Sequence, residues 1–331
     1  MNIKRILKNI LLYGIGIIII FLIIWHIGID EIIAVFSSMN IYLFLLAVLI
    51  YIITIFTIVM RWKSILQINE YNAKFKNLFL LSMMGQFINN ITPSMKGGSE
   101  PFRAYYLSKL EHIPNHISFS SVVVERVLDT FVFLILTFFV IVYFIINGII
   151  YAKELIFIWV LVGGLTVVGL YILMHKTLAF KITLKIAKII TKFSSKTINE
   201  DKIKESIRLF QDNIRFFNKN KRKIIMPFIL SFGWWILDIL RIYVSFLAIK
   251  CNISLVAISS TYLISLLIGI IPTLPGSLGT SDAVMIAMYS LFNIPYSKAA
   301  AGTILDRIIS YGLATIMGAL SYKIIKRKLN K

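Results

Sequence analysis

Long apolar runs separated by short polar segments fill most of the chain. A helix needs about 20 consecutive apolar residues to cross the hydrocarbon core of a bilayer. Runs of about that length lie near residues 10–29, 41–60, 130–147, 155–174, 226–248, 253–271 and 300–322, and shorter ones lie near 78–92 and 283–294. The pattern therefore predicts an all-α integral membrane protein with about seven to nine transmembrane helices.

Two of the apolar stretches are interrupted by similar motifs. The first motif contains Pro93, Gly97, Gly98, Ser99 and Glu100, and the second contains Pro275, Gly276, Gly279, Ser281 and Asp282. Each is followed about 25 residues later by an acid beside an arginine, Glu125-Arg126 and Asp306-Arg307. Because proline and glycine break helices, a bilayer tolerates such breaks only where the freed backbone is buried in protein or lines a wet cavity. Paired breaks in the two halves of a chain point to the substrate site of a transporter.

Lysine and arginine mark the cytoplasmic side of membrane proteins. The N-terminus, residues 61–77, residues 175–223 and the C-terminal tail are rich in both, so both termini are expected in the cytoplasm. Residues 78–126 must then start and finish inside, and residues 253–299 must start and finish outside. The motifs are thus expected on two re-entrant or broken-helix segments that are related as inverted repeats. Two ordinary helical hairpins are the alternative.

The whole chain, 1–331, is predicted to form a single polytopic domain in the cell membrane. Its first motif region covers about 78–129, its basic segment about 175–223 and its second motif region about 253–311. Within the basic segment, lysines recur every three or four residues with apolar residues between them. That spacing predicts an amphipathic helix that lies in the membrane interface with its amines on anionic headgroups. A solvated topology determinant is the alternative interpretation.

The composition agrees with a membrane protein and argues against other classes. Hydrophobic residues make up 58% of the 331 positions and charged residues 15%, and the mean hydropathy is +0.85. Such a chain is too apolar for a soluble globular protein. The lysines and arginines that give the net charge of +20 lie between apolar runs and at both ends of the chain, so nucleic-acid binding is not expected. One cysteine, Cys251, and four scattered histidines predict no disulfide, no metal site and no cofactor.

Ionisable side chains border or interrupt the apolar sequence near both motifs. Such groups are costly at membrane depth and are functional candidates by default. They are Glu100, Arg103, Glu125, Arg126, Asp129, Asp282, Asp306 and Arg307. Pairing Glu100 with Arg126 and Asp282 with Arg307 would offset the cost of burial, so these residues either bind substrate or form structural salt bridges. No residue is assigned a catalytic role.

Arginine is the fitting side chain for phosphate, because its planar fork bonds two oxygens at once. Two arginines and the amide groups of two helix ends, converging near the membrane midplane, would form an anion site. Ser99 and Ser281 stand where each new helix starts and could instead cap its free amides. Either motif acid, if desolvated, could exchange a proton during transport. Asp238 and Arg241, three residues apart, are expected to share a helix face and to line the same cavity.

Together these residues resemble the flippase-like membrane domain shared by lysylphosphatidylglycerol synthases and related bacterial and archaeal membrane proteins. The resemblance covers nearly the whole chain. It is carried by Gly98-Ser99-Glu100 with Arg103, by Glu125-Arg126 with Asp129, and by Pro275-Gly276 and Leu278-Gly279 before the acid, then Arg307 and Tyr311. The resemblance implies a helical membrane protein that translocates a modified anionic phospholipid or a polyprenyl-linked sugar. Membrane lipids are the implied partners, and a homo-oligomer is left open.

Two departures from the family pattern bear on the substrate. The family usually reads Pro-Gly-Arg-x-Gly-Glu or similar in its first motif, whereas this chain is one residue longer between Pro93 and Glu100. The second motif usually carries Glu where this chain has Asp282. The aminoacyl transferase domain of the synthases does not follow the last apolar run, so lysyl transfer is not expected.

The sequence therefore favours a flippase-like lipid translocase over an enzyme. It would move an anionic or modified phospholipid or a lipid-linked headgroup. An integral-membrane transferase acting on a lipid-linked donor is one alternative, for which the acidic pair Asp30 and Glu31 would serve metal-dependent glycosyl transfer. A non-transporting accessory protein, whose buried charges serve helix packing alone, is the other.

Overall fold

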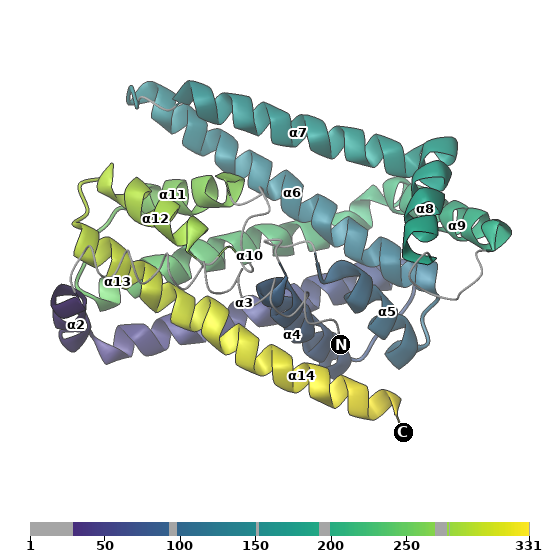
Figure 1. Ribbon diagram of the computed structural model, residues 1–331, viewed down its shortest axis with the longest axis horizontal. Coiled ribbons are helices and arrows are strands. Elements are labelled where there is room, and N and C mark those ends of the chain that lie inside the picture. Colours follow the sequence, from purple (N-terminus) through teal and green to yellow (C-terminus); the bar gives the residue numbers. More distant parts are fainter. Residues whose placement is uncertain are drawn as a thin grey trace.

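The computed structural model describes residues 29–92, 98–149, 152–191, 199–268, 277 and 279–330, and these form an all-helical bundle (Figure 1). The predicted all-α fold is confirmed. The first predicted run, 10–29, lies outside the described residues except for its last position, where α2 (Ile29–Ser37) begins.

Five helices of the described chain are long and apolar enough to cross a membrane. They are α3 (Ile41–Ile68), α6 (Asn115–Ile146), α7 (Ala152–Met174), α10 (Lys221–Ala248) and the continuous helix formed by α13 (Tyr296–Arg307), the π-helical segment η2 (Ile308–Leu313) and α14 (Ala314–Leu329). The predicted spans at 41–60 and 130–147 were too short. Hydropathy falls at charged residues, but here the charged residues are buried inside the helices and the helices continue through them.

The two motifs lie in short helical hairpins that enter the bundle from opposite ends (Figure 1). The first is α4 (Phe75–Ile91) followed by α5 (Glu100–Glu111), and the second is α11 (Leu255–Ile268) followed by α12 (Thr280–Ser290). Helices α5, α11 and α12 have 12, 14 and 11 residues, fewer than the roughly 17 that the shortest membrane span requires. Within the described residues these three helices are too short to cross a membrane, as re-entrant segments would be.

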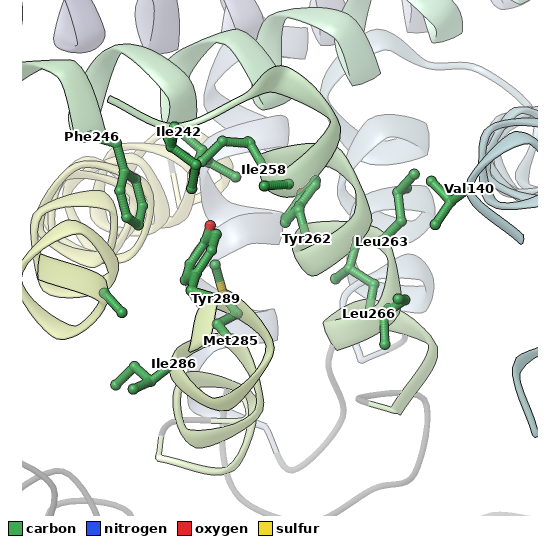
Figure 2. Close-up of a cluster of buried hydrophobic side chains, with 14 of the residues drawn as sticks. Val140, Ile242, Phe246, Ile258, Tyr262, Leu263, Leu266, Met285, Ile286 and Tyr289 are labelled. Atoms are coloured by element: carbon green, nitrogen blue, oxygen red, sulfur yellow. The ribbon is translucent and has the colours of Figure 1, made fainter. Parts of the chain in front are cut away.

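The second hairpin is held by a dense apolar cluster (Figure 2). Ile258, Tyr262, Leu263 and Leu266 of α11 and Met285, Ile286 and Tyr289 of α12 face Ile242 and Phe246 of α10, with Val140 of α6 at its edge. The rings of Phe246 and Tyr289 lie 4.7 Å apart between centroids. This packing holds α12, which carries Asp282 in its first turn, against α10 and α11.

Basic residues gather at one end of the bundle. Helices α8 (Lys176–Thr191) and α9 (Glu200–Lys219) lie at the same end as the last turns of α14, whereas α2 lies at the opposite end (Figure 1). The basic segment thus forms two helices rather than one. On α8, Ile182, Ile186 and Ile189 are exposed and follow one helical face, beside a row of lysines. An apolar stripe next to amines suits a helix that lies in the interface.

Helix α14 packs closely against α4 through Gly318. A Cβ atom at this position would lie 2.4 Å from the carbonyl oxygen of Met83 and 2.5 Å from Cβ of Phe87.

We expect Gly318→Leu to lower the free energy of unfolding by about 3 kcal/mol or more, because backbone atoms of α4 cannot move aside. Thermal unfolding of the purified protein in detergent measures the loss. Gly164→Ala in α7, where the new methyl group meets nothing within 4 Å, is the matched control and should leave stability unchanged or slightly raised. A Gly318→Leu variant as stable as the wild type would contradict this close contact.

Candidate functional site

Two cavities lie inside the bundle, one beside each motif. The first, of about 40 Å³, is lined by residues of α3, α4, α5, α6 and α10, and the second, of about 120 Å³, by residues of α3, α4, α10, α11, α12, α13 and η2. Both are lined by Ile58, Gln86 and Trp234, so these three side chains form a common wall. Each cavity contains a cluster of arginines and carboxylates at membrane depth.

The first cluster is centred on Glu125 of α6. One oxygen of its carboxylate accepts a hydrogen bond from Arg61 Nη2 at 2.7 Å, and the other accepts one from Arg103 Nη2 at 2.8 Å. Arg61 also bonds to Asp129, one turn further along α6. The guanidinium of Arg103 lies 4.1 Å from the ring of Trp62, so a cation–π contact adds to its ion pair. These charged groups are buried and paired with one another, although Nε of Arg61 and Nε of Arg103 have no hydrogen-bond partner among the described residues.

Arg126, beside this cluster, is more open. Its Nε donates to Glu100 Oε1 at 2.6 Å, and its Nη1 lies 3.7 Å from Asp129 Oδ2. The side chain of Arg126 is 30% exposed, against 3% for Arg61 and 5% for Arg103. The predicted pair of Glu100 and Arg126 is therefore confirmed, and Arg126 is the arginine of this cluster that can meet a ligand.

The second cluster repeats the pattern in the other half of the chain. Arg241 of α10 donates from Nη1 to Asp238 Oδ1 at 2.6 Å and from Nε to Asp306 Oδ1 at 2.9 Å. Tyr262 of α11 donates its hydroxyl to the other oxygen of Asp238. Asp238 and Arg241 do share a helix face and line the second cavity, as predicted.

Arg307 is the open arginine of this second cluster. Its Nε donates to Asp282 Oδ1 at 2.6 Å, its Nη2 donates to the hydroxyl of Ser281, and its side chain is 23% exposed. The predicted pair of Asp282 and Arg307 is confirmed. The π-helical segment η2 begins at the next residue, Ile308, and such segments often occur at functional sites.

The two clusters correspond position by position. A buried arginine on a long helix, Arg61 or Arg241, bonds to the acid of each acid-arginine pair, and the arginine of that pair bonds to the acid that follows each break. The hairpins that carry those acids enter from opposite ends of the bundle (Figure 1). This is the arrangement that an inverted-topology repeat produces.

The starts of α5 and α12 differ from the prediction that serines cap them. Ser99 makes no capping hydrogen bond with its side chain, and its amide instead donates to Asn89 Oδ1 at 3.1 Å. In the second motif the amide of Gly279 donates to Asp282 Oδ2 at 2.8 Å, while Ser281 donates to the carbonyl oxygen of Ser277. The serine-capping alternative was therefore wrong, because an asparagine on the preceding helix and the motif acid itself satisfy these amides.

Glycine is needed at two of the predicted break positions. Gly279 has a φ of 81°, in the left-handed region that side chains avoid. A Cβ atom at Gly98 would lie 2.5 Å from Oγ1 of Thr92. The predicted break residues Pro93, Gly97, Pro275 and Gly276 lie outside the described residues.

Sequence reasoning missed the part that Arg61 has in the site. Arg61 was assigned to a cytoplasmic loop, 61–77, but it is buried within α3 and holds Glu125 and Asp129. The error arose because a lone arginine at the end of an apolar run looks like a flanking charge. The signal that could have found it is the correspondence with Arg241, which is an arginine inside the matching span of the second half.

No group of three His, Cys, Asp or Glu side chains within the described ranges is placed to hold a metal ion. Cys251, in the connection between α10 and α11, is buried, and burial raises the pKa of its thiol. A thiol with a raised pKa is a poor nucleophile at neutral pH. The charged clusters are thus suited to binding a polar group by ion pairs and hydrogen bonds.

Comparison with known proteins finds a matching family model and several relatives of this chain. Residues 9–318 match the family model described as the lysylphosphatidylglycerol synthase TM region. A UPF0104 membrane protein of Methanocaldococcus jannaschii is 46% identical over 99% of this chain and 98% of its own length. Another from Methanothermobacter thermautotrophicus is 32% identical over 83% of this chain and 82% of its own, and one from Pyrococcus horikoshii is 28% identical over 95% and 96%.

Proposed function

This chain belongs to the family of the lysylphosphatidylglycerol synthase TM region and is a multi-pass membrane protein, and from that premise we propose that it translocates an anionic or modified phospholipid, or a lipid-linked headgroup, across the cell membrane. The observation that carries the proposal is the pair of open arginines, Arg126 and Arg307. Each lines a cavity next to a motif hairpin, and the two hairpins enter the bundle from opposite ends (Figure 1).

The difference in exposure between the buried and the open arginines supports an anion as the substrate. Arg61, Arg103 and Arg241 are almost fully buried and are held by carboxylates, so they hold the interior charges in place. Arg126 and Arg307 keep about a quarter of their side chains exposed to a cavity. A guanidinium that bonds a carboxylate through Nε retains donors for a phosphate oxygen. A phosphate group shared by phospholipids and polyprenyl-linked sugars fits this chemistry.

The distribution of lysine and arginine supports one orientation of the protein in the membrane. The end with α8, α9 and the last turns of α14 carries most of the lysines and arginines of the described chain. By the positive-inside rule this end faces the cytoplasm. The first hairpin then opens towards the cytoplasm and the second towards the outside, which is the geometry that alternating access requires.

The transferase alternative gains nothing from the structure. Asp30 and Glu31 lie exposed in the first turn of α2, at the end of the bundle away from α8 and α9 (Figure 1). Neither lines a cavity that contains the charged clusters. The accessory-protein alternative differs from a translocase in a measurable way, because it predicts no movement of lipid.

Reconstitution into proteoliposomes tests the proposal. Headgroup translocation would be followed for labelled phosphatidylglycerol, its lysyl derivative, a polyprenyl phosphate and a neutral lipid. We expect at least one phosphate-bearing anionic or modified lipid to cross faster than in protein-free vesicles, and faster than the neutral lipid. Folded protein that moves none of the four would overturn the proposal.

A further inference from the structure

The two charged clusters do not balance in the same way. In the first half, Arg61, Arg103 and Arg126 face three carboxylates, those of Glu100, Glu125 and Asp129. In the second half, Arg241 and Arg307 face three carboxylates as well, those of Asp238, Asp282 and Asp306. The second cluster therefore has one carboxylate more than it has guanidinium groups.

The difference traces to one position on the helix that follows each break. Arg103 lies three residues after Glu100 and bonds to Glu125. Met285 lies three residues after Asp282, is buried and lines the second cavity. A methionine therefore occupies the place where the first half has its additional positive charge.

The described surroundings of the second cluster supply no other positive charge. The ionisable side chains that face it are Tyr51 of α3, Tyr262 of α11, Tyr289 of α12 and Tyr311 of η2. The intervening sequence, 269–276, contains no ionisable side chain. A net negative charge buried at membrane depth is costly by several kcal/mol, and a proton bound to one of the three carboxylates would remove it.

From this imbalance we infer that the carboxylate of Asp306 binds one exchangeable proton and forms the coupling site of the transporter. The inference rests on the proposed function for its transport role, but the proton itself does not. Both oxygens of Asp238 accept hydrogen bonds, one from Arg241 and one from Tyr262, whereas Arg241 bonds only one oxygen of Asp306. Asp306 Oδ2 has only a 3.4 Å contact with the hydroxyl of Ser310 among the described hydrogen bonds, so it is the oxygen with room for the proton.

The exchange step is a simple acid dissociation. The O–H bond at Asp306 Oδ2 breaks, its electron pair stays on the carboxylate, and a water molecule in the 120 Å³ cavity takes the proton. The cluster then carries a net charge of −1 and repels an anionic headgroup at Arg307. With the proton bound, the cluster is neutral and the repulsion is absent. By linkage, headgroup binding and proton binding favour each other, so the anion and the proton move together.

Infrared spectroscopy of the purified protein tests the proton without any transport assay. The carbonyl stretch of a protonated carboxylic acid should be present in the wild type at neutral pH and should disappear at high pH. Asp238→Asn and Asp306→Asn should each abolish it, because each leaves two carboxylates for two guanidinium groups. Asp212→Asn, which removes an exposed carboxylate on α9, should retain the band. A wild type without the band, or a band that survives in either cluster variant, overturns the inference.

Transport in proteoliposomes tests the coupling. The wild type should move an anionic lipid more slowly as pH rises, with a slope of one proton, whereas any transport that Asp306→Asn retains should show no such dependence. Wild-type transport that is insensitive to pH overturns the coupling. If no lipid moves while the infrared band behaves as described, the proposed function fails but the proton site stands.

Discussion

Replacing Arg126 or Arg307 by glutamine is expected to slow translocation of the anionic lipid by about 10- to 100-fold. Each open guanidinium would give the phosphate a charge-assisted hydrogen bond worth about 1.5–3 kcal/mol, and about 1.4 kcal/mol corresponds to a tenfold change. Glutamine still offers a donor to the partner acid, Glu100 or Asp282. The fold should therefore persist, and the loss should appear in the transport rate measured in proteoliposomes.

Lysine at the same positions separates charge from geometry. Lysine keeps the positive charge but lacks the planar fork, so Arg126→Lys and Arg307→Lys should retain more transport than the glutamine variants and less than the wild type. Arg215→Gln on α9, where the arginine is exposed and pairs with Asp212, is the matched control and should transport at the wild-type rate. Folded glutamine variants that transport as fast as the wild type would show that these arginines have a structural role only.

Replacing Arg61 by methionine is expected to destabilise the protein by about 3–5 kcal/mol, which is the usual result of removing one partner of a buried ion pair. Arg61 holds Glu125 at 2.7 Å and Asp129 as well, and it donates to Ser231 of α10 at 3.2 Å. Without it, Asp129 keeps only the distant Arg126 as a counter-charge. Unfolding titrations in mixed micelles, compared with the wild type, measure the loss.

A second substitution identifies the cause of that instability. Asp129→Asn in the Arg61→Met background removes the uncompensated carboxylate, so it should restore part of the lost stability even though it adds no contact. Lys63→Met controls for the loss of a positive charge alone. Lys63 is a half-buried cation in the same helix, and it has no ion pair among the described residues. A double variant no more stable than Arg61→Met would place the cost in packing rather than in the buried charge.

Much of the fold follows from the sequence because the bilayer imposes strict requirements on it. Apolar length predicts the spans, and proline and glycine next to an acid predict the two breaks. The pairs of Glu100 with Arg126 and of Asp282 with Arg307 could be predicted because the same spacing occurs twice. The repeated spacing supported these two ion pairs, which one motif alone would not have predicted.

The rest of the site could not be predicted because it depends on contacts between distant segments. Arg61 reaches Glu125 only because α3 packs beside α6, and Asn89 takes the place of a serine cap only because α4 ends against the start of α5. The common wall of Ile58, Gln86 and Trp234 brings together three helices. None of these pairings leaves a periodic signal along the chain.

The contact between Gly318 and α4 can form only late in synthesis, because it joins helices that lie far apart in the sequence. The surface of α4 that Gly318 covers, at Met83 and Phe87, is synthesised long before its partner. At a synthesis rate of about 5–20 residues per second, roughly 10 to 45 s pass between the synthesis of α4 and that of α14. During that interval α4 can pack against α3 and α5, but the face that Gly318 will cover lacks its partner.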